Sequence, residues 1–160
     1  MPRSPGVLAL CTGVDGASRR LGRVNSERYG LTKFGLLKQE DEIEIVAALA
    51  IAVVAILHIV FLVMEMFLWT KPLGRRSFGL TQELADATAS LAKNQGLYNG
   101  FLAAGLIWAA LSGSWSLQLF FLGCVIVAGV FGGLTVGRSI LWIQAAPGAV
   151  ALLLAFLARS

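Results

Sequence analysis

The sequence predicts an all-α fold: an integral membrane four-helix transmembrane bundle preceded by a disordered N-terminal leader. Hydrophobic residues make up 57% of the 160 residues and charged residues only 14%. Soluble domains average about 45–50% apolar and about 25% charged residues, so the composition indicates a membrane protein. The apolar residues are gathered into four long runs, each close to the ~20 residues that a helix needs to cross a bilayer.

The length and charge of the chain exclude several classes of protein. Four spans and short loops occupy most of 160 residues, which leaves no room for a separate soluble catalytic domain. The net charge is only +4, and the sequence shows no basic face of the kind that binds nucleic acid. Cys11 and Cys124 lie far apart in the chain, so they predict neither a disulfide framework nor a metal site.

Residues 1–42 differ from the rest of the chain and are predicted to be a leader, either disordered or arising from a misassigned start. Seven of the thirteen Lys and Arg residues fall in the first forty positions, and no amphipathic period runs through them. The apolar stretch near Val7 is too short for the core of a signal peptide. The membrane domain is therefore predicted to occupy residues 43–160.

The four predicted spans cover residues of about 45–69, 95–111, 117–136 and 140–158. The first should end at Trp69, because Trp anchors at the membrane interface and Pro72 stops a helix three residues later. Residues 70–94 are expected to form the main loop, with Thr81 capping a short amphipathic helix inside it. The tight turn 137–139 should join the last two spans.

Lys and Arg near the spans predict the orientation of the bundle. The segment 70–94 carries Lys71, Arg75, Arg76 and Lys93, and the turn 137–139 carries Arg138, whereas the connection between the second and third spans carries none. Cytoplasmic loops are enriched in these residues. Both segments are therefore expected in the cytoplasm, with both termini outside, in a multi-pass protein of the inner membrane.

Polar side chains inside the predicted spans form a candidate intramembrane polar cluster. Polar and ionisable groups are costly in a bilayer and often mark a functional site. His58 and Glu65 lie seven residues apart, on one helix face and about 10 Å apart along the axis. Helical rise predicts that amide side chains from two other spans join Glu65 at a similar depth. The cluster consists of His58, Glu65, Gln95, Asn99 and Gln144, with Asn94 and Tyr98 as neighbours.

A structural interpretation of these residues stays open. Amide side chains in membrane helices often only hydrogen-bond a neighbouring helix. Glu65 could equally be satisfied by reaching toward Lys71 or Arg75 at the interface. Close helix packing is the expected role of four glycines in two small-xxx-small patterns, Gly96 with Gly100 and Gly129 with Gly133.

The sequence predicts no catalytic residue, no metal site and no cofactor. It lacks a Cys-x-x-Cys pair, a zinc-type His pair, a phosphate-binding glycine loop and a Gly-x-Ser-x-Gly motif. Three functions remain open. The polar cluster could handle a small molecule or a proton, it could specify packing in a structural or accessory subunit, or His58 and Glu65 could be the acid–base pair of an enzyme acting on a lipid or quinone.

The expected partners are the lipid bilayer, further copies of the chain and an unidentified small molecule, with no nucleic acid. Beyond these residue-level arguments, the chain resembles a small bacterial membrane family, domain of unknown function 1304. The resemblance covers roughly residues 45–158. It is carried by His58 and by the segments 65–75, 78–80, 94–105 and 119–123. It implies a compact four-helix protein of the inner membrane without an assigned activity, and it transfers no catalytic roles.

Overall fold

The structure is a computed structural model that describes residue 39 and residues 41–159. The chain divides into a unit of residues 1–42 and a unit of residues 43–160. The predicted leader, residues 1–42, lies outside the described residues except for Gln39, Asp41 and Glu42. All regular structure in the described part of the chain is helical, which confirms the all-α prediction.

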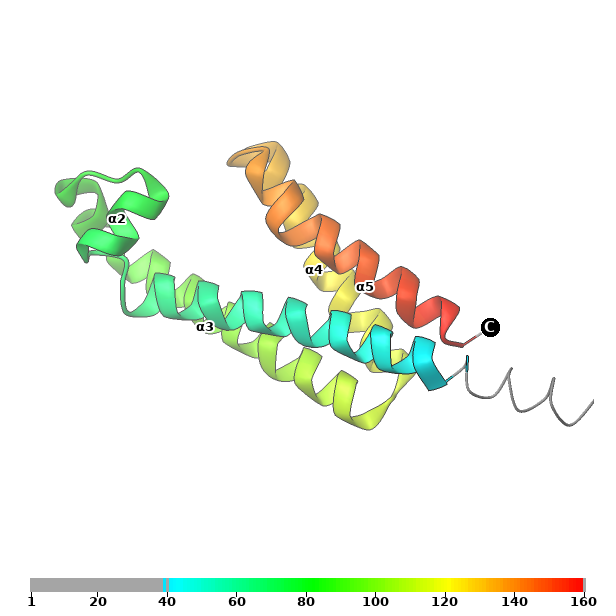
Figure 1. Ribbon diagram of the computed structural model, residues 1–160. Coiled ribbons are helices and arrows are strands. Elements are labelled where there is room, and N and C mark those ends of the chain that lie inside the picture. The colour runs from blue at the N-terminus through cyan, green and yellow to red at the C-terminus, as the bar shows by residue number, and fades with distance from the viewer. Residues whose placement is uncertain (1–38, 40, 160) are drawn as a thin grey trace, which may run out of the picture. The chain divides into compact units, whose positions relative to one another are not determined.

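Four long helical segments and one short helix follow one another along the chain (Figure 1). In order they are the helix Asp41–Met66, α2 (Pro72–Phe78), α3 (Gln82–Ser112), α4 (Trp115–Thr135), the π-helical turn Leu141–Ala145 (η1) and α5 (Ala146–Leu157). The Asp41–Met66 helix packs along α3, and α4 packs against both α3 and the η1–α5 segment.

The segment 70–94 is more helical than the sequence analysis expects. Thr81 caps a helix as predicted, with its Oγ1 accepting a hydrogen bond of 3.2 Å from the backbone N–H of Leu84. That helix is α3, which runs on without a break to Ser112 instead of ending before a separate second span. No Gly or Pro stands between Gln82 and Gln95, so the polar residues there interrupt the hydropathy but not the helix.

The last predicted span is also irregular, because it begins with a π-helical turn. Pro147 has no backbone N–H, so it cannot donate the α-helical hydrogen bond to the carbonyl four residues earlier. The preceding backbone shifts to the wider π spacing, in which the N–H of Ala146 donates to the carbonyl of Leu141. α5 then continues from Ala146 to Leu157.

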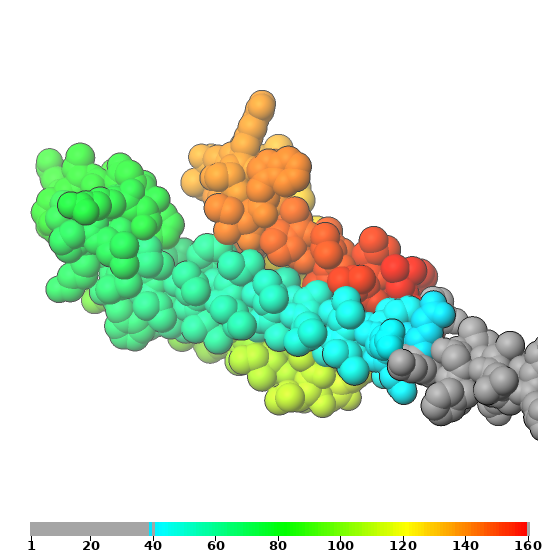
Figure 2. Space-filling view, in the orientation of Figure 1, coloured from blue at the N-terminus to red at the C-terminus, as the bar shows by residue number. Residues whose placement is uncertain are grey.

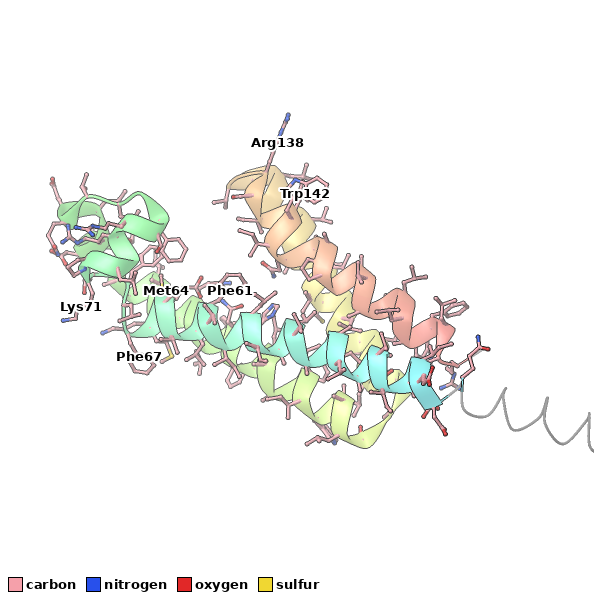
Figure 3. The ribbon with its side chains drawn as sticks, viewed as in Figure 1. Phe61, Met64, Phe67, Lys71, Arg138 and Trp142 are labelled. Carbon is pink, nitrogen blue, oxygen red and sulfur yellow. The ribbon has the colours of Figure 1, made fainter. Side chains whose placement is uncertain are left out.

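Alanines make up most of the buried apolar residues of the described unit, and many large apolar side chains lie at its surface. Nine of the fourteen buried apolar residues among those described are alanines. Val127, Phe131, Leu134 and Trp142 are each more than two-thirds exposed, and Figure 3 shows Trp142 projecting from the helices. A soluble protein buries its large apolar side chains, whereas membrane helices approach one another through small residues.

Two helices among the described residues are long and apolar enough to cross a membrane, Asp41–Met66 and Trp115–Thr135. Only 28% and 22% of their most apolar windows are buried, unlike the core helices of a soluble protein. The segment Leu141–Leu157 is apolar but shorter, and α3 is long but more polar. The four-span membrane bundle therefore stays a prediction, while the helical fold and two candidate spans are established.

Candidate functional site

Glu65 and Asn99 form a hydrogen-bonded pair between two helices. The Nδ2 of Asn99 on α3 donates to Oε2 of Glu65 at 2.7 Å, and it also lies 3.3 Å from the backbone carbonyl oxygen of Gln95. Asn99 is buried and Glu65 is half-buried. Glu65 stands in the last turn of its helix, where the backbone carries partial negative charge, so a hydrogen-bond donor from another helix stabilises a carboxylate there.

Glycines on α3 allow the close approach that this pair requires. A Cβ on Gly96 would lie 2.6 Å from Cγ of Met66 and 3.2 Å from the carbonyl oxygen of Leu62. A Cβ on Gly100 would lie 2.6 Å from Cδ1 of Leu62. These glycines flank Asn99 along α3, so the polar pair sits where the two helices are in close contact.

The other two predicted packing glycines face the last helical segment. A Cβ on Gly129 would lie 2.6 Å from the backbone nitrogen of Ala145. A Cβ on Gly133 would collide with the side chain of Leu141. α4 and η1 are therefore in contact at positions where no larger residue fits without displacement of the backbone or a side chain.

His58 is enclosed in the unit and is only 1% exposed. Its Nδ1 lies 2.8 Å from the carbonyl oxygen of Val54, and because a carbonyl only accepts, Nδ1 carries a proton. The ring meets Phe61 edge-on, with centroids 5.8 Å apart. Its Nε2 is buried and has no hydrogen-bond partner among the described residues, which is a costly arrangement for a polar atom.

The remaining residues of the predicted cluster do not join the Glu65–Asn99 pair through their side chains. Gln95 and Asn94 are exposed, and Gln95 contributes only its backbone carbonyl. Tyr98 is exposed, with its ring edge-on to Phe101 at 6.1 Å. Gln144 is half-buried, and no hydrogen bond connects it to the cluster within the described chain.

Helical rise relates Gln144 to His58 rather than to Glu65. Ala47 and Ala155 line the same cavity, at the end of the unit where the first helix begins and α5 ends. Eleven residues separate Ala47 from His58, and eleven separate Gln144 from Ala155. The side chains of His58 and Gln144 therefore each stand about 16 Å along their helices from the level of the cavity. Glu65 stands two helical turns further along the first helix.

That cavity was not anticipated from the sequence. It has a volume of about 240 Å³, and its polar lining residues include Glu44, Gln118 and Arg159. The Arg159 guanidinium carbon lies 5.4 Å from the centre of the Trp115 ring, a cation–π distance. These residues come from distant parts of the chain, so no spacing in the sequence could have connected them.

The partner of Glu65 is a neutral amide and not a cation, and this decides which chemistry the Glu65–Asn99 pair can perform. No Lys or Arg forms an ion pair with Glu65 in the described chain, although the sequence offers Lys71 and Arg75 nearby. An amide carries both donors and an acceptor, so it can hydrogen-bond a carboxylate or a protonated carboxyl group. No group of three or more His, Cys, Asp or Glu residues that could hold a metal ion occurs among the described residues.

One protein-family model matches the part of the chain that contains the Glu65–Asn99 pair. The model described as "Protein of unknown function (DUF1304)" matches residues 52–156, which include both members of the pair and His58. No curated protein matches the chain, and no solved structure matches it. The match begins within the Asp41–Met66 helix and ends one residue before the end of α5.

Proposed function

The chain belongs to the DUF1304 family, and we propose that it is a multi-pass integral membrane protein that binds and releases a proton at Glu65. In this proposal the proton is either the transported species or is coupled to a small molecule. The observation that carries the proposal is the partner of Glu65: a neutral amide at 2.7 Å instead of a cation.

The membrane part of the proposal is supported by the distribution of side-chain size. Nine of the fourteen buried apolar residues among those described are alanines, whereas Val127, Phe131 and Leu134 on α4 and Trp142 on η1 are exposed. The 31 residues of α3 extend about 46 Å, which exceeds a hydrocarbon core of ~30 Å. Its first turns, with Glu83, Asp86 and Lys93, would extend into the cytoplasm, and its apolar second half would cross the bilayer.

With η1 and α5 as a fourth crossing, the number of spans is even. Both termini then lie outside, and α2 and the turn 137–139 lie in the cytoplasm. Lys71, Arg75, Arg76 and Arg138 are consistent with that orientation, because cytoplasmic segments are rich in Lys and Arg. Bacterial inner membrane is the location that fits this charge distribution.

The proposal of proton binding rests on the ability of Asn99 to hydrogen-bond Glu65 in both its ionised and its protonated state. Its Nδ2 donates to a carboxylate, and after protonation its Oδ1 can accept from the carboxyl O–H when the amide rotates. A bidentate Arg would instead hold the group ionised. Glu65 lies one residue from the end of its helix, four residues before Trp69, so a short path separates it from the cytoplasmic face.

The test uses the full chain reconstituted in vesicles that contain a pH-sensitive dye, with an imposed membrane potential. Wild-type protein should change the internal pH, and Glu65→Gln should abolish that change while it keeps a hydrogen bond to Asn99. Glu83→Gln removes an exposed carboxylate from the same region and serves as the control. Undiminished proton movement through Glu65→Gln would refute the proposal.

A structural or accessory role is the second candidate, and the position of the pair favours it. Gly96 and Gly100 flank Asn99 at the closest approach of the two helices, so the hydrogen bond can act in packing alone. In that case Asn99→Leu lowers thermal stability, and Glu65→Gln leaves every activity unchanged. The enzyme interpretation has less support, because the 240 Å³ cavity is not lined by His58 or Glu65.

A further inference from the structure

The short helix α2 is held firmly against the ends of two longer helices. Gly74 lies against the backbone carbonyl of Leu68, at a position where a Cβ would collide with it. The ring of Trp69 lies 4.8 Å from that of Phe78, and its Nε1–H donates to Oγ1 of Thr88 on α3 at 3.0 Å. These contacts fix α2 in place and do not depend on any charged group.

The end of α2 is shaped by its glycine cap. Gly79 adopts the left-handed conformation, with φ of 66°, and the N–H of Leu80 donates to the carbonyl of Arg75 at 2.8 Å. This is the hydrogen-bond pattern of a Schellman cap, which favours glycine at the left-handed position. The cap sets the direction in which Arg75 and Arg76 leave the last turn.

An open cavity of about 510 Å³ lies on this helix, lined by Pro72, Arg75, Arg76, Gly79 and Leu80. Figure 2 shows the α2 side chains, in green, gathered at one end of the unit and separate from the side chains of the turn before η1, in orange. The cavity therefore belongs to α2 and its cap alone.

The lining carries positive charge that no acid in the described chain neutralises. Arg75 and Arg76 stand in the last turn of α2 and line the cavity, and Lys71 stands at the start of α2, outside the lining. None of the three forms an ion pair with a described residue. The nearest carboxylates in the sequence are Glu65, which accepts a hydrogen bond from Asn99, and Glu83 on α3. Asp86 on α3 accepts a hydrogen bond from Gln82.

One donor in the cavity is already removed from solvent without a partner. The Nε of Arg75 is buried and makes no hydrogen bond with any described residue. Leaving a buried guanidinium N–H unsatisfied costs free energy. Arg75 and Arg76 both line the cavity, and guanidinium groups bind the oxygens of a phosphate through charge-assisted hydrogen bonds.

We propose that α2 is a binding site for a phosphoester anion, held by Arg75 and Arg76 with Lys71 adding charge. In the orientation proposed above, the site faces the cytoplasmic headgroup layer, and Trp69 and Phe78 give α2 an aromatic side of the kind that lies at an interface. The ligand chemistry is shared by an anionic lipid headgroup and by free phosphate, and the site is independent of the proton at Glu65.

The test titrates the full chain in phosphatidylcholine nanodiscs with short-chain phosphatidylglycerol and, separately, with inorganic phosphate. Binding is followed by native mass spectrometry and by the rise in melting temperature. Arg75→Gln with Arg76→Gln is compared with Lys93→Gln with Arg138→Gln, which removes the same charge from exposed residues outside the cavity. Figure 3 shows Arg138 projecting from the turn before η1.

The α2 double variant should weaken phosphatidylglycerol binding about tenfold or more, because it removes the charge-assisted hydrogen bonds that two guanidinium groups donate to a phosphate. The control pair should change it less than about threefold. The exposed Arg76→Gln alone, which leaves Arg75 and the glycine cap intact, should weaken binding about fivefold. Displacement by inorganic phosphate would identify free phosphate as a ligand of the same residues.

Two results would overturn the proposal that α2 binds a phosphoester anion. Equal losses in the two double variants would mean that the lipid responds to net charge and not to α2. Unchanged binding of both phosphatidylglycerol and phosphate in the Arg76→Gln variant would mean that the cavity holds no phosphoester. Loss of the proton signal at Glu65 is a separate result, because Glu65→Gln should leave phosphoester binding at α2 intact.

Discussion

The amide nitrogen of Asn99 lies 2.7 Å from Oε2 of Glu65, and this hydrogen bond connects the last turn of the Asp41–Met66 helix to the middle of α3. Among the described residues, it is the one hydrogen bond that joins two side chains of the predicted polar cluster. Its strength and its role can be separated by experiment.

Asn99→Ala should destabilise the protein because it leaves a half-buried carboxylate without its donor. We expect the free energy of unfolding in detergent to fall by about 1–2 kcal/mol, in the range of interhelical hydrogen bonds in membranes. Asn94→Ala removes an exposed amide one turn earlier on α3 and should change stability by less than about 0.5 kcal/mol. Equal effects of the two substitutions would contradict a specific role for Asn99.

Substitution by alanine should have opposite effects on stability at Gly129 and at Gly123, which both lie on α4. Gly129→Ala places a Cβ 2.6 Å from the backbone nitrogen of Ala145, so we expect a loss of about 1–3 kcal/mol from overpacking. Gly123 has nothing within 4 Å of an added Cβ, and Gly123→Ala should leave stability unchanged or raise it by up to about 1 kcal/mol. Thermal unfolding followed by circular dichroism compares them; a Gly129→Ala protein as stable as wild type would show that α4 and η1 are not in close contact.

His58→Leu should not destabilise the protein. The substitution removes a buried Nε2 that has no partner among the described residues, while the helix keeps its backbone hydrogen bonds. We expect an unchanged melting temperature or a gain of about 1 kcal/mol in unfolding free energy. A large loss would reveal a partner for Nε2, with Gln144 as the first candidate because it stands at the same level.

Trp69→Phe should loosen α2 without unfolding the rest of the unit. The substitution removes the hydrogen bond to Thr88 Oγ1 and keeps an aromatic ring against Phe78. We expect amide hydrogen exchange in Pro72–Leu80 to accelerate about five- to tenfold, which corresponds to one hydrogen bond of about 1 kcal/mol. Trp108→Phe, at an exposed position, is the control and should leave exchange in α2 unchanged.

The proposed topology predicts which positions a membrane-impermeant thiol reagent reaches. In a chain without Cys11 and Cys124, Ser77→Cys and Arg138→Cys should be labelled from the cytoplasmic side, and Ser112→Cys from the opposite side. All three side chains are exposed in the described unit, so packing does not block the reagent. Labelling of Ser77→Cys and Ser112→Cys from one side would refute a crossing by the second half of α3.

The sequence by itself determined the helical class, the family and the positions of the helix signals. Thr81 caps a helix and Pro147 disturbs one because capping and the missing N–H of proline act over a few neighbouring residues. The family follows from residues 52–156 alone. The sequence did not predict α2, the π-helical turn Leu141–Ala145 or the continuity of α3 through 82–94, where hydropathy falls while helix propensity does not.

The tertiary structure alone decided which polar groups meet. Sequence spacing placed Glu65, Asn99 and Gln144 at one depth, but in the structure Gln144 stands nearer the level of His58 than that of Glu65. The direction of each side chain depends in addition on how each helix is rotated. Asn99 faces Glu65, Gln95 faces outward, and His58 is enclosed without a partner for Nε2. The rotation is fixed by contacts between distant residues, such as Gly96 with Leu62 and Gly129 with Ala145, which no local pattern encodes.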